Sequence, residues 1–104
     1  MDTQYLEQIA RQFSDDLWTP KEAVGYCYQE VADLEPTDRA TAIREAVSPA
    51  MFEHLRNAAV RALDAIPPDF DHFGLGLVTP DAAWAVTEVP RSFVESLANG
   101  DATS

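Results

Sequence analysis

Apolar side chains recur every three or four positions over most of the chain, which is the spacing of amphipathic helices. Leu6, Ile9, Phe13 and Leu17 form one such stripe, and the segment 49–66 carries the longest one. Prolines and hydroxyl residues separate the stripes. The pattern predicts helices over 3–17, 20–34, 38–47 and 49–66.

Two of these helices have clear start signals. Thr19 precedes Pro20 and stands three residues before Glu22, which predicts a capping box at the start of the second helix. Ser48 precedes Pro49 in the same way and predicts the start of the fourth helix.

The region after Pro67-Pro68 changes character. The segments 73–78 (FGLGLV) and 84–89 (WAVTEV) are short and have strand composition, and a turn at Pro80-Asp81 would join them into a hairpin. A competing interpretation starts a helix at Thr79-Pro80. We favour the hairpin.

A last helix is expected to begin at Ser92, with Glu95 completing a second capping box and Asn99-Gly100 ending it. The sequence therefore predicts a mostly α fold, a compact domain of four to five helices with a C-terminal β-hairpin. We expect residues 1–100 to form this single domain and residues 101–104 to be a frayed tail.

Length and composition fit one small core. A domain of 104 residues has a radius of gyration of roughly 13 Å. Hydrophobic residues make up 46% of the chain, which excludes an intrinsically disordered class. The single cysteine, Cys27, allows no intrachain disulfide, and we see neither a secretion signal nor a membrane span. We therefore expect a cytoplasmic location.

The net charge restricts the class of partner more than any other property of the sequence. Eighteen acidic residues face seven basic ones, giving a formal net charge of −11, and Lys21 is the one lysine. Such a field repels nucleic acid and anionic membranes, so direct binding to either is disfavoured. It attracts a basic protein partner. Solubility, or adaptation of a proteome to salt, is an alternative reason for the acidity.

Several acids also stand at predicted helix ends, where the negative end of the helix dipole disfavours them by about 0.3–1 kcal/mol each. They are Asp15, Asp16, Glu30, Asp33, Glu35 and Asp64, with Asp38 just past the second helix. Local rules that are broken without visible compensation indicate where function should be sought.

The second helix gathers most of these acids beside an aromatic ring. Spacings of four, four and three residues place Glu22, Tyr26, Glu30 and Asp33 on one face. A tyrosine rimmed by acids suits contact with a basic surface, although a solvated helix face has the same pattern. The candidate partner-binding residues are Glu22, Tyr26, Glu30, Asp33, Glu35 and Asp38.

Other chemistry has weaker support. Asp69, Asp71 and His72, with His54, could offer ligands to a metal, but no recognised ligand spacing is present, so we expect no metal or other cofactor. Cys27 lies on an apolar stripe, which favours buried packing over reactivity.

The first hypothesis is thus a non-enzymatic module that docks on a basic partner protein. One form is an inhibitor that blocks the partner's nucleic-acid site, of the kind that phage or mobile elements encode. A second hypothesis is a small-ligand or enzyme subunit with a cleft near His54, Asp71, His72 and Trp84. A third is a structural homodimer.

Overall fold

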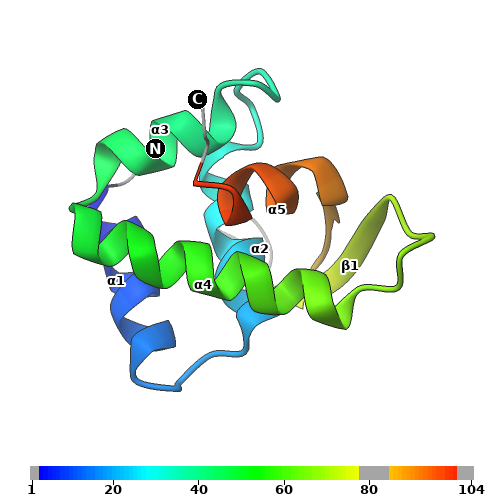
Figure 1. Cartoon of the computed structure of the whole chain (residues 1–104), viewed down its shortest axis with the longest axis horizontal. Helices are drawn as coiled ribbons and strands as arrows, with labels where there is room; N and C mark the ends of the chain where they lie inside the picture. The colour runs from blue at the N-terminus through cyan, green and yellow to red at the C-terminus, as the bar shows by residue number, and fades with distance from the viewer. Residues whose placement is uncertain (1–2, 78–84, 101–104) are drawn as a thin grey trace.

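The computed structural model describes residues 3–77 and 85–100, and within them the chain forms five helices and one β-hairpin (Figure 1). The predicted mostly α class with a C-terminal hairpin is confirmed. In chain order the elements are α1 (Thr3–Ser14), α2 (Pro20–Val31), α3 (Arg39–Ala46), α4 (Pro49–Ala65), β1 (His72–Leu77), β2 (Ala85–Pro90) and α5 (Arg91–Ala98).

The helix α2 lies at the centre of the fold. It packs against α1, α3, α4 and both strands, and α4 crosses in front of it in Figure 1. The helix α5 packs on α4, and the hairpin lies beside the C-terminal end of α4. The radius of gyration is 12.4 Å, close to the value expected for one domain of this length.

The core is apolar and closely packed. Among the described residues no polar or charged side chain is fully buried. Three alanines of α4, Ala58, Ala59 and Ala62, are fully buried and let the neighbouring helices approach closely. The largest fully buried side chains include Leu6, Ile9, Ile43, Leu55 and Leu97. Burial of each of these stabilises the fold by about 1.5–3 kcal/mol relative to exposure.

Both predicted capping signals are formed. At the start of α2, the Glu22 amide donates to Thr19 Oγ1 (3.2 Å) and the Thr19 amide donates to Glu22 Oε1 (3.0 Å). At the start of α4, the Met51 amide donates to Ser48 Oγ over 3.3 Å. The caps satisfy amides that have no partner within the helix, which fixes where α2 and α4 begin.

The helix α1 ends at Ser14, three residues before the predicted end. Asp16 has a φ of 62°, which is the left-handed region. The Leu17 amide donates to the Gln12 carbonyl and the Asp16 amide to the Phe13 carbonyl, which is the Schellman arrangement. This turn takes Leu17 off the apolar stripe, and 66% of its surface is exposed.

The helix α2 also ends early, at Val31 instead of residue 34. The Leu34 amide donates to the Val31 carbonyl in a tight turn, and the Arg39 guanidinium donates to the Ala32 carbonyl over 2.8 Å. These bonds satisfy carbonyls that the next helical turn would otherwise have used. Leu34, predicted to continue the apolar stripe, is therefore exposed.

The strands β1 and β2 pair antiparallel, with Phe73 opposite Val89. Both of these side chains are buried, whereas His72, Gly74, Val86 and Glu88 are exposed, which is the alternation of a sheet with one buried face. The predicted turn at Pro80-Asp81, the competing helix start at Thr79-Pro80 and the predicted strand residue Trp84 lie outside the described residues.

The helix α5 begins at Arg91, directly after β2, instead of at Ser92. Pro90 occupies the N-cap position and no side-chain cap bond is made, so the predicted second capping box is wrong. Glu95 pairs instead with Arg91 (3.3 Å), whose own amide donates to the Asp71 carbonyl next to β1. The strand pairing thus sets the start of the helix. The predicted end is confirmed, with Gly100 at a φ of 72°.

Candidate functional site

The predicted partner-binding residues fall into two groups, one on α2 and one on the connection between α2 and α3. Glu22, Tyr26 and Glu30 lie on α2 and are partly buried. Asp33, Glu35 and Asp38 follow the helix and are exposed. Because α2 ends at Val31, these three acids do not continue its face.

The group on α2 is engaged inside the fold. The carboxylate of Glu22 accepts a hydrogen bond from the Thr19 amide as part of the capping box. The ring of Tyr26 packs against Trp18, with centroids 4.6 Å apart, and meets Tyr5 of α1 edge-on at 6.4 Å. Tyr26 is therefore a member of an aromatic cluster between α1 and α2, and only part of the ring can reach a partner.

Glu30 contributes charge to the same region. Partial burial raises the pKa of Tyr5, and the neighbouring Tyr26, Glu30 and Cys27 raise it further. Burial also raises the pKa of the Cys27 thiol, with a smaller contribution from the charge of Glu30. Cys27 is fully buried, as predicted, and is an unreactive packing residue.

We call Asp33, Glu35 and Asp38 the acidic loop. The connection that carries them projects from the edge of the molecule (Figure 1). Within residues 3–77 and 85–100, no lysine, arginine or histidine nitrogen lies within 4.0 Å of these three carboxylates. Three negative charges are thus presented to solvent without an ion-pair partner from the described part of the chain.

Arg39 is the basic residue next to the acidic loop, and it points inward. Its guanidinium donates to the Ala32 carbonyl and lies over the ring of Tyr28, with the guanidinium carbon 5.0 Å from the ring centroid. The Nε atom of Arg39 is buried without a hydrogen-bond partner in the described structure. Arg39 therefore offsets the negative dipole end of α2, but it does not form ion pairs with the acids.

The predicted cleft near His54, Asp71, His72 and Trp84 is formed only in part. Asp71 and His72 border an open hollow of about 600 Å³. His54 lines a different hollow, with Asp16 and Arg61. Trp84 lies outside the described residues. The two histidines are therefore not brought together.

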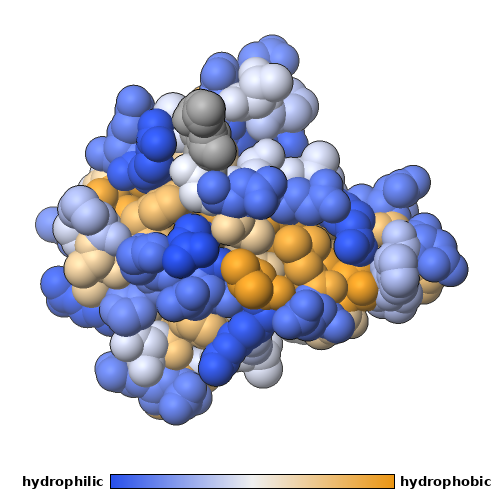
Figure 2. All heavy atoms as spheres, in the orientation of Figure 1, coloured by the Kyte–Doolittle hydropathy of each residue, from blue (hydrophilic) through white to orange (hydrophobic). Residues whose placement is uncertain are grey.

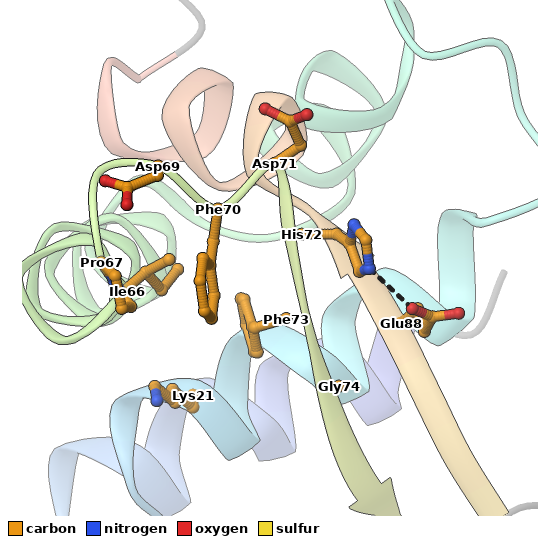
Figure 3. Close-up of a pocket in the computed structure, with 10 residues that line it drawn as sticks. All are labelled: Lys21, Ile66, Pro67, Asp69, Phe70, Asp71, His72, Phe73, Gly74 and Glu88. Carbon is orange, nitrogen blue, oxygen red and sulfur yellow. Dashed lines mark ion pairs between the residues drawn. The ribbon is translucent and has the colours of Figure 1, made fainter.

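We call the first of these the phenylalanine hollow (Figure 3). The first turn of α2, the connection from α4 to β1, and the hairpin form its walls. Its lining residues are Lys21, Ile66, Pro67, Asp69, Phe70, Asp71, His72, Phe73, Gly74 and Glu88.

Two phenylalanines dominate this hollow. Phe73 is 8% exposed and belongs to the core, whereas 52% of Phe70 is exposed. A phenylalanine carries about 200 Å² of surface, so about 100 Å² of Phe70 faces water, and covering it would gain about 2–3 kcal/mol. Phe70 was not among the residues predicted from the sequence. Its signal was an aromatic residue between two aspartates in a loop after prolines, a setting in which a core residue is unusual.

Charged groups surround the two rings. The Nζ of Lys21 lies 5.8 Å from the centroid of Phe73, and His72 Nε2 lies 2.8 Å from a carboxylate oxygen of Glu88. The carboxylates of Asp69 and Asp71 stand at the rim and point away from the rings in Figure 3. In the described part of the chain, no three histidine, cysteine, aspartate or glutamate side chains converge as metal ligands.

Most of the face in Figure 2 is hydrophilic, and its apolar residues gather along the seam between α4 and α5 toward the hairpin. Among the described residues, no helix has the length and hydropathy needed to cross a bilayer. Comparison with known proteins finds no matching family model, no similar curated protein and no similar solved structure.

Proposed function

We propose that this domain is a non-enzymatic module that binds a basic protein partner through the acidic loop. The observation that supports this proposal is that Asp33, Glu35 and Asp38 are exposed and have no ion-pair partner among the described residues, while Arg39 beside them is turned into the fold. Arg39 caps the end of α2, so its charge does not neutralise the acidic loop, and the three carboxylates can receive cations from outside.

The charge of the whole chain supports the same function. A net charge of −11 attracts a basic partner over distances of about a Debye length, roughly 8 Å at physiological salt. Individual exposed ion pairs contribute only about 0–1 kcal/mol each. The acidic loop therefore acts mainly on the rate and orientation of encounter, and binding falls as salt is added.

One concrete form of this function is an inhibitor. A protein surface that binds nucleic acid carries clustered lysines and arginines that neutralise phosphates, and the same surface attracts carboxylates. A domain with a projecting acidic loop competes with nucleic acid for such a surface. Bound partner should then lose its nucleic acid in a competition assay, and unchanged nucleic-acid binding would rule out this form.

The test requires the partner, which can be captured from the native host at low salt and released at high salt. The dissociation constant of the purified complex is then measured for the unmodified chain and for the double variant Asp33→Lys, Glu35→Lys. We expect the double variant to bind at least about tenfold more weakly, since about 1.4 kcal/mol of lost attraction gives that factor. Its melting temperature should be unchanged, because both side chains are exposed.

The matched control is the double variant Asp15→Lys, Asp64→Lys. It makes the same change in net charge at two exposed acids away from the acidic loop. The proposal expects only a small loss of affinity for this control. Equal weakening by both double variants would show that bulk charge alone governs binding, and full retention by the loop variant would exclude the acidic loop as the contact.

A further inference from the structure

The phenylalanine hollow has the size and the walls of a binding site. Its volume of about 600 Å³ lies within the range of roughly 300–1,000 Å³ that ligand sites occupy. Apolar residues from the α4–β1 connection and from β1 form its interior, and polar groups stand at its edge (Figure 3). About half of Phe70 is open to water at this point, whereas the neighbouring Ile66 and Phe73 are buried.

The charges around the hollow select the ligand. Asp69, Asp71 and Glu88 bring three carboxylates, against the ammonium of Lys21 and the guanidinium of Arg91, which donates to the Pro67 carbonyl and pairs with Glu95. His72 Nε2 lies 2.8 Å from a carboxylate oxygen of Glu88, and both side chains are more than half exposed, so this contact is a surface pair at one edge of the hollow. The excess of negative charge favours a cation at the mouth of the hollow and disfavours an anion.

The aromatic walls suit a cation that has an apolar stem. The chain itself shows this arrangement, because the ammonium of Lys21 lies 5.8 Å from the centre of the Phe73 ring. Phe70, which is 52% exposed, offers a second ring with no covering side chain over half of its surface. A guanidinium stacks on such a ring better than an ammonium does, because it is planar and more weakly hydrated.

We propose that the phenylalanine hollow binds an arginine side chain of the basic partner, with the guanidinium stacked on Phe70 and attracted by the excess of carboxylates around the hollow. This inference rests on the proposed function for the source of the arginine, but the site consists of other residues than the acidic loop. Lys21 lies in the first turn of α2 and the acidic loop follows its last turn, so the 12-residue helix separates the two sites by about 18 Å.

The test uses one amino acid as a probe, which is too small to reach both sites. N-acetyl-arginine methylamide is titrated into the ¹⁵N-labelled full chain while backbone amide shifts are recorded. We expect saturable shifts concentrated at residues 69–74, with a dissociation constant on the order of 1 mM, as is usual for a ligand of this size. The citrulline analogue has the same shape without the charge and should bind at least about fivefold more weakly.

Two variants test the contributions of the exposed ring and of the lysine charge. Phe70→Ala should weaken arginine binding about fivefold or more, because it removes the exposed ring. Lys21→Met should strengthen it, because it removes the one repelling ammonium. Val86→Ala changes another exposed apolar side chain, on β2 and outside the hollow, and should leave binding unchanged.

Several results would overturn the inference. They are equal binding of arginine and citrulline, tighter binding of N-acetyl-glutamate methylamide, loss of binding in Lys21→Met, and no effect of Phe70→Ala. The double variant Asp33→Lys, Glu35→Lys should bind the arginine probe like the unmodified chain. The experiments can therefore contradict arginine binding at the hollow without contradicting partner binding at the acidic loop, and the reverse.

Discussion

Replacement of Asp16 by glycine should stabilise the fold. Asp16 follows α1 with a φ of 62°, and among the described residues it is the one non-glycine residue with positive φ. The left-handed region places Cβ close to the following carbonyl oxygen, which glycine avoids because it has no Cβ. The carboxylate of Asp16 also lies at the negative end of the α1 dipole.

The expected gain is the balance of two favourable effects and one unfavourable effect. Relief of the left-handed strain contributes about 1–2 kcal/mol, and less where an aspartate side chain tolerates this region. Removal of the acid from the helix end contributes about 0.3–1 kcal/mol. The added freedom of glycine in the unfolded chain opposes this by about 0.5–1 kcal/mol. The free energy of unfolding should rise by about 1 kcal/mol, which raises the melting temperature by about 4–8 °C.

Chemical denaturation measures the change directly, as a higher midpoint at an unchanged slope. Asp16→Asn separates the two causes, because asparagine removes the charge and still tolerates the left-handed region, so about half of the gain should remain. Asp15→Gly is the matched control. It removes the neighbouring acid at a residue without positive φ and should leave the stability unchanged or lower it by up to about 0.5 kcal/mol.

An Asp16→Gly variant that is no more stable than the unmodified chain would contradict this prediction. Equal stabilisation by Asp16→Gly and Asp15→Gly would show that charge alone matters. In that case the Schellman turn would not store the strain that its φ implies.

Other predictions concern the ends and the interior of α2. Thr19→Ala removes the capping bond to the Glu22 amide and should lower the free energy of unfolding by about 1 kcal/mol in denaturant titrations; no loss would mean that solvent replaces the cap. Arg39→Ala should cost about 1–2 kcal/mol and speed amide exchange in the last turn of α2, and Arg39→Lys should recover little, because lysine lacks the planar group over Tyr28. The raised pKa of Cys27 means that the folded chain keeps the thiol proton when the unfolded chain has lost it. Stability should therefore fall above about pH 8.5 by up to about 1.4 kcal/mol per pH unit, and Cys27→Ala should flatten this slope between pH 8.5 and 10.

Much of the fold followed from local rules. The helical spacing and the two hydroxyl-proline starts placed α2 and α4, because a cap and a proline act within one turn of the chain. The end of α5 at Asn99-Gly100 followed for the same reason. The start of α5 did not, since Pro90 is held by the pairing of β2 with β1, and a strand pair depends on residues far apart in the sequence.

The candidate sites divide in the same way. The sequence identified the acids of the acidic loop, but not that α2 stops before them, because the stop depends on Arg39 reaching back to the Ala32 carbonyl. It identified Tyr26 as an aromatic residue among acids, but not its contacts with Trp18 and Tyr5, which arise when α1 packs on α2.

The sequence by itself determined the helical class, the charge and the buried role of Cys27, since composition, periodicity and caps act locally or as sums over the chain. Only the tertiary structure decided which side chains are free to meet a partner. It turned Arg39 inward beside the acidic loop, and it left Phe70 half exposed between α4 and β1. Exposure depends on what the rest of the chain covers, and no local pattern carries that information.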